Sequence, residues 1–185
     1  MKQQTNSNPD AVSGPVIGEL INLSGRQRML SQRIVLHALL ASLGDRAALA
    51  VLKTCLASFA QAHTELVHGN ERLPGVFSEA LREVYFGNGQ ADERIQQFVV
   101  LAEHAASSIE AGRDDQQSQV DALVTRATPL LELLQEITLA YQHEMRGIEA
   151  AAGKRQADIA ARLSNISMQA NIVALNARIS AARAG

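Results

Sequence analysis

The residues with the clearest potential for binding chemistry lie in segment 21–33, which reads INLSGRQRMLSQR. Between residues 20 and 44 the chain has three arginines and no acidic residue, so this segment is locally basic. In a helix, the stripe that follows Arg28 at heptad steps is apolar at both ends and small and polar in the middle. Its members are Ile17, Ile21, Ser24, Arg28, Ser31, Val35 and Ala38. The pattern predicts a packing seam with one arginine at its centre.

A second copy of the same helix can complete this seam, because a two-fold contact pairs each patch with its own copy. Two Arg28 guanidinium groups about 5 Å apart would repel by roughly 3 kcal/mol at an effective dielectric near 20. A small planar anion between them would reverse that sign, because each guanidinium offers paired N–H donors to trigonal oxygens. Ser24, Ser31 and the backbone at Gly25 could supply further donors. Nitrate has the size, shape and charge for such a site.

Two other interpretations of Arg28 stay open from the residues alone. The guanidinium could pair with a carboxylate on another helix of its own bundle, although no acidic residue lies near it in its own helix. It could also lie in solvent. Arg26 and Arg33 share a helix face, which is typical of a solvated face or of the rim of a site.

Turn and capping signals predict four long helices around this segment. Pro15 suits a first helical turn, Gly44 ends the first helix, and Asp45 can cap the second. We expect Pro129 to bend the fourth helix or to mark a boundary. The apolar piece 76–86 lies between turn signals and predicts one or two helical turns that plug one end of the bundle. The predicted long helices are 16–43, 46–67, 91–111 and one that begins near 115.

These elements predict an all-α fold, an antiparallel four-helix bundle with a long C-terminal helical extension, in a homodimer. The composition agrees, because 46% of the 185 residues are hydrophobic but only 3% are aromatic, and such cores suit closely packed helices. Residues 1–15 read as a disordered lead-in and 16–152 as the bundle. Residues 153–185 read as a coiled-coil segment, with a heptad that begins at Ile159.

Composition also excludes several classes of function. A net charge of −2 argues against direct nucleic-acid binding, and no apolar run is long enough for membrane insertion. The lone Cys55 cannot form an internal disulfide and fits a reducing compartment. The five histidines lack metal-ligand spacing, and no catalytic constellation is present. We therefore expect no enzyme activity, no metal and no cofactor.

Segment 21–33 resembles the first helix of the PilJ-type sensor domain of type IV pilus chemoreceptors, which is akin to the nitrate-sensing domain of NarX-type kinases. In that family the first helices of two protomers meet at the dimer axis and hold nitrate through one arginine from each. The resemblance covers roughly residues 16–150. It implies that Arg28 binds nitrate or nitrite, with Gly25, Met29, Ser31 and Arg33 completing the motif.

The C-terminal residues 168–185, MQANIVALNARISAARAG, are similar to the descending limb of the signalling hairpin of methyl-accepting chemotaxis proteins. Ser180 stands where that family typically has glutamate, and Arg178 replaces a small residue. The sequence also stops where the hairpin would turn, so the returning helix is missing. We expect these departures to alter receptor assembly and coupling to a kinase.

Together these features predict a dimeric sensor of nitrate or nitrite that relays a conformational change through its helices in chemotaxis or nitrate-responsive signalling. Because only a short polar helix joins the sensor to the coiled-coil segment, both must share one compartment, and we expect the cytoplasm. The alternative is a ligand-free helical interaction module. In that case residues 159–185 would dock onto helices of chemoreceptors or of a nitrate-assimilation regulator.

Overall fold

The computed structural model describes residues 12–184, which form five helices and no strand within that range. The predicted all-α class is therefore confirmed. The predicted lead-in lies outside the described residues for 1–11, whereas Gly14 and Pro15 already belong to the first helix. The helices are α1 (Gly14–Ser42), α2 (Arg46–His68), α3 (Glu79–Phe86), α4 (Ala91–Ala111) and α5 (Gln116–Ala184).

The helix ends follow the local signals in the sequence. Asp45 caps α2, because its carboxylate accepts the backbone N–H groups of Ala47 at 2.9 Å and Ala48 at 3.2 Å. Ser78 caps α3, where its hydroxyl accepts the N–H of Leu81 at 3.2 Å. Gly112 follows α4 with φ 59°, a left-handed conformation that costs glycine nothing.

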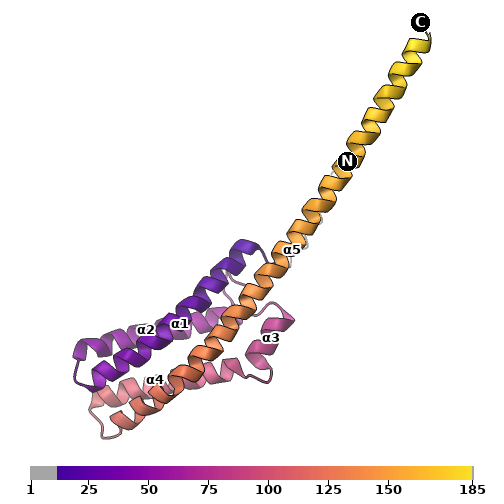
Figure 1. Cartoon of the computed structure of the whole chain (residues 1–185). Coiled ribbons are helices and arrows are strands. Elements are labelled where there is room, and N and C mark those ends of the chain that lie inside the picture. The colour runs from indigo at the N-terminus through magenta and orange to yellow at the C-terminus, as the bar shows by residue number, and fades with distance from the viewer. Residues whose placement is uncertain (1–11, 185) are drawn as a thin grey trace. The chain divides into compact units, whose positions relative to one another are not determined.

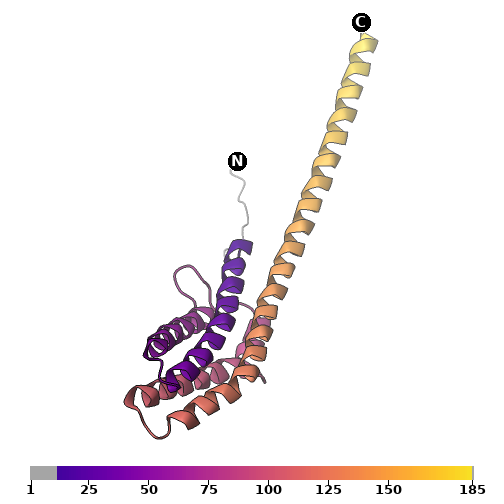
Figure 2. The same cartoon turned by 60° about the vertical axis from the view of Figure 1, so that its left-hand side comes forward.

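α1, α2, α4 and the first part of α5, up to Met145, form an antiparallel four-helix bundle. The short α1–α2 and α4–α5 turns lie at one end of this bundle, and the longer connection that carries α3 lies at the other (Figures 1 and 2). Short turns between long helices force neighbours to run antiparallel, so the predicted topology is confirmed.

The core of the bundle is aliphatic, with a few aromatic rings at its centre and at the α3 end. Phe59 of α2 and Phe98 of α4 meet edge to face with ring centroids 5.6 Å apart. In α3, Leu81 and Tyr85 are fully buried, which confirms that this short helix plugs one end of the bundle. The aliphatic side chains and these rings together provide the hydrophobic contribution to the stability of the bundle.

α5 continues through Pro129 without ending, so of the two outcomes predicted for this proline, a bend or a boundary, the boundary is absent. Proline removes one helix hydrogen bond, but Leu130, Leu133 and Leu134 directly after it are buried in the core. Their packing holds the chain helical across the defect.

The chain divides into two units, residues 1–145 and 146–185, whereas the sequence placed the boundary at 152. The second unit contains the end of α5, and all its described side chains from 149 to 183 are exposed. Among the described helices, none combines the length and apolar character that crossing a bilayer requires.

Candidate functional site

The stripe predicted to meet a second copy packs instead inside the chain's own bundle. Its members Ile17, Ser24, Ser31, Val35 and Ala38 are at most 8% exposed. The seam prediction is therefore corrected. α1 needs this face for α2, α4 and α5 of the same chain, and small side chains let those helices approach closely.

Both serines of the predicted site have bonded their hydroxyls within the chain. Ser24 Oγ lies 2.6 Å from Thr138 Oγ1 of α5. Ser31 Oγ donates to the carbonyl oxygen of Arg28 at 2.8 Å. Each serine is 1% exposed, so neither lies on a surface that a second copy could contact directly.

Arg28 itself lies half-buried at the edge of this packed stripe. Among the residues that the structure describes, no carboxylate lies within ion-pair distance of its guanidinium. The Arg28 Nε is buried and has no hydrogen-bond partner in the described part of the chain. A buried N–H without an acceptor is costly, so Arg28 is the residue of the predicted site whose side-chain donor the described chain leaves unsatisfied.

The outer neighbours of Arg28 form an open surface on α1. A Cβ added to Gly25 would meet nothing within 4 Å, Met29 is 50% exposed, and Gln32 is also exposed. Gly25 and Gln32 lie about one turn before and after Arg28, so they border its accessible side. Gln32 was not among the predicted site residues, although its position one turn from Arg28 was the signal that could have included it.

Arg33 is exposed but lies on a different side of α1 from Arg28. At about 100° per residue, the two side chains leave the helix about 140° apart. The structure therefore brings Gly25, Arg28 and Met29 of the predicted site onto one surface, while Arg33 stands apart from them. Whether any of these residues binds an anion stays a prediction.

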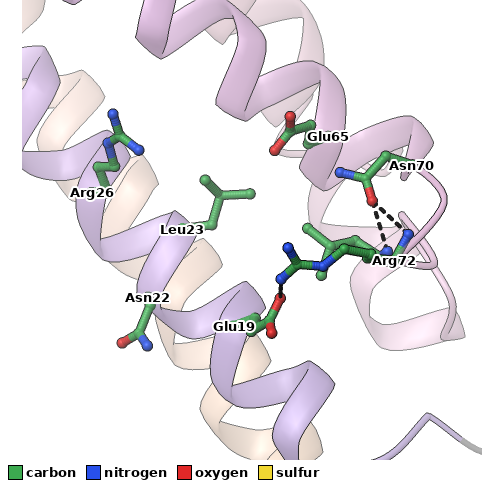
Figure 3. Close-up of a pocket in the computed structure, with 8 residues that line it drawn as sticks. Glu19, Asn22, Leu23, Arg26, Glu65, Asn70 and Arg72 are labelled. Carbon is green, nitrogen blue, oxygen red and sulfur yellow. Dashed lines mark hydrogen bonds and ion pairs between the residues drawn. The ribbon is translucent and has the colours of Figure 1, made fainter.

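Arg26 lines a separate open cleft between α1 and the loop that follows α2 (Figure 3). In this cleft Arg72 Nη2 lies 2.7 Å from Glu19 Oε2, and Glu65 lies on the opposite wall. The cleft thus contains two arginines and two glutamates, so its fixed charges balance. A cleft of balanced charge does not select an anion, which agrees with Arg26 being a solvated residue.

A second polar cluster lies buried where α2, α3, α4 and α5 meet. His63 Nε2 lies 2.7 Å from Asp92 Oδ1, and Tyr85 and Tyr141 join their hydroxyls at 3.4 Å. Burial lowers the pKa of His63, and this effect outweighs the opposing influence of Asp92. Burial also raises the pKa of Tyr141 to about 12. The His63–Asp92 contact and the tyrosine pair link these four helices, whereas the buried His63 Nδ1 has no hydrogen-bond partner among the described residues.

The described residues contain no group of three or more His, Cys, Asp or Glu side chains arranged to hold a metal ion.

Comparison with protein families matches residues 17–181 to the N-terminal region of type IV pili methyl-accepting chemotaxis transducers (PilJ). The match includes the bundle and most of the exposed second unit, so it extends beyond the range of the resemblance seen in the sequence. No curated protein and no solved structure matches the chain.

Proposed function

Because the chain belongs to the PilJ family of type IV pili methyl-accepting chemotaxis transducers, we propose that its bundle senses nitrate or nitrite. The family is one of signalling regions, which fits a helical bundle in which Arg28 has a buried side-chain donor without an acceptor in the described chain. The observation that carries the proposal is the Arg28 guanidinium, whose Nε is buried without an acceptor and which has no carboxylate beside it in the described chain.

A small planar anion meets the needs of this arginine. Its oxygens can accept two parallel N–H groups from one guanidinium, and its charge offsets the cost of leaving the guanidinium half-buried. In our proposal two copies meet along the outer side of α1, not along the packed stripe. Gly25 lets the backbones approach, Gln32 offers an amide donor, and the second Arg28 completes the site.

The proposed signal passes from α1 to α5 inside the bundle. The Ser24–Thr138 hydrogen bond joins the two helices directly, one turn before Arg28 on α1. An anion that draws two α1 helices together favours one arrangement of each bundle over another. It can shift the equilibrium between these two arrangements by no more than the difference between its affinities for them. We place the protein in the cytoplasm in this proposal, with nitrate or nitrite as the only ligand.

The test is titration calorimetry of the full chain with sodium nitrate, with sodium sulfate as the control for anion type. The wild type should bind one nitrate per two chains, and Arg28→Ala should lose this heat. Arg28→Lys should bind at least about tenfold more weakly, because lysine cannot offer a planar pair of donors.

Arg113→Ala is the matched control, since Arg113 is an exposed arginine in the α4–α5 turn. It should bind nitrate as the wild type does. Equal affinity in Arg28→Ala and the wild type, with both proteins folded by their melting curves, would remove the proposed role of Arg28.

A second candidate function is a ligand-free interaction module, and the exposed apolar side chains of residues 159–179 favour it. In that case nitrate would leave both the melting temperature and the mass of the protein in solution unchanged. The tail would then be the only functional surface.

A further inference from the structure

The second unit of the chain exposes large apolar side chains in two separate rows. We call residues 159–183 the tail. Its first stripe repeats at steps of four and three, and its second stripe follows the same spacing in another register. The first stripe contains Ile159, Leu163, Ile166, Ala170, Val173 and Ala177. The second stripe contains Met168, Ile172, Leu175 and Ile179.

These side chains are too exposed to be stable in water alone. The large members of the two stripes are between 42% exposed, at Ile179, and 67% exposed, at Val173. Contiguous apolar surface of this kind marks a binding site in a soluble protein.

The two stripes lie on nearly opposite sides of the helix. At about 100° per residue, the centre of the second stripe is roughly 190° from that of the first. A two-stranded coiled coil covers a single seam on each of its helices, so one partner helix would leave a whole stripe in water. The tail therefore needs a helix on each side.

The charges of the tail argue against other copies of the tail as these partners. From Arg146 to the end of the chain there are six basic and two acidic residues, and none of the acidic ones follows Asp158. The net charge of this unit is +4, which leaves −6 for residues 1–145 of a chain that carries −2 in all. Tails packed in register through the second stripe would set Arg178 of one copy beside Arg183 of the other, and like charges at such flanking positions are destabilising.

We propose that the tail docks as a central helix between two helices of an acidic partner protein. One partner helix covers the first stripe and the other covers the second, and glutamates or aspartates beside the apolar contacts pair with the tail arginines. This docking is independent of nitrate, so its failure and that of the anion site are distinguishable.

The probe for this proposal is a synthetic amphipathic peptide with leucine and isoleucine at the seam positions and glutamate at the flanking ones. A second peptide carries lysine in place of each glutamate. Sedimentation and fluorescence anisotropy of the full chain should show two acidic peptides bound per chain. The lysine peptide should bind at least about tenfold more weakly, and a higher salt concentration should weaken the binding of the acidic peptide.

Three variants separate the two stripes from general effects on the helix. Ile166→Asp in the first stripe and Ile172→Asp in the second should each reduce the stoichiometry to one peptide per chain. Asn171→Asp is the matched control, because it introduces the same side chain between the stripes and should keep two peptides. All three residues follow Met145, so the melting of the bundle should not change.

Three results would overturn the proposal. The first is equal affinity for the acidic and the lysine peptide. The second is a stoichiometry of one in the wild type, or of two in Ile172→Asp as in the control. The third is self-association of the chain through the tail that excludes both peptides.

Discussion

The hydrogen bond between Ser24 and Thr138 allows a sharp test of how α1 is held against α5. The Thr138 hydroxyl donates its only proton to the carbonyl oxygen of Leu134 at 2.9 Å. In the 2.6 Å contact between the two hydroxyls, Ser24 must therefore be the donor and Thr138 the acceptor. Ser24 is 1% exposed and Thr138 is 3% exposed, so water cannot replace either partner.

Thr138→Val keeps the shape of the side chain but removes the acceptor of Ser24. A buried donor left without an acceptor costs roughly 1–3 kcal/mol, which in a domain of this size lowers the melting temperature by roughly 2–4 °C per kcal/mol. Ser24→Ala should cost less, about 0.5–1.5 kcal/mol, because Thr138 keeps its bond to Leu134. In the double variant no polar group is left unpaired, so its cost should fall below the sum of the two by about 1–2 kcal/mol.

Urea unfolding of the four proteins measures these free energies, and Thr125→Val is the control. Thr125 lies on the same helix and also bonds a backbone carbonyl, but it is exposed, so its loss should change the free energy of unfolding by less than about 0.5 kcal/mol. If Thr138→Val costs no more than Thr125→Val, or if the two core substitutions are simply additive, the proposed direction of the bond is refuted.

Two further predictions concern the core and the loop after α2. Burial keeps the pKa of His63 below 6.5, so the unfolded chain binds a proton at this histidine more readily than the folded chain, and the free energy of unfolding should fall as pH drops below about 6.5 towards the folded pKa. Denaturant titrations from pH 8 to 5 should show a weaker pH dependence of this free energy for His63→Gln than for the wild type. An unchanged pH dependence in His63→Gln would contradict this. Gly69 has φ 77°, and an added Cβ would overlap the backbone of Leu73 and Gly75, so Gly69→Ala should cost at least about 2 kcal/mol. Gly25→Ala is its control in calorimetric melting, since replacing a helical glycine that has open space above it should stabilise the protein by up to about 1 kcal/mol. Equal effects of the two substitutions would show the loop to be less constrained than described.

The helices could be predicted from the sequence because their signals are local. Asp45, Gly44 and Gly112 each act on the backbone within a few residues, so capping rules place the helix ends to within about two residues. At Pro129 the sequence left a bend and a boundary open. The boundary is absent because the buried leucines that follow outweigh the local effect of the proline, and their packing depends on distant parts of the chain.

The surroundings of Arg28 could be predicted only in part. A heptad stripe shows that a face will be covered, but it does not show whether another helix of the same chain or a second copy covers it. Ser24 and Ser31 were placed with Arg28 for that reason, and the structure turns both inward. The sequence left open that Arg28 pairs with a carboxylate on another helix of its bundle, and no described carboxylate lies within ion-pair distance of it.

The buried tyrosine pair also has a practical consequence for spectroscopy. The chain contains no tryptophan, and Tyr85 and Tyr141 are its only tyrosines, both fully buried where α3 meets the bundle. Their ultraviolet absorbance and emission therefore report on that end of the bundle alone, while residues 146–185 contribute no signal. A tryptophan-bearing peptide or partner could then be followed in a mixture without labelling either protein.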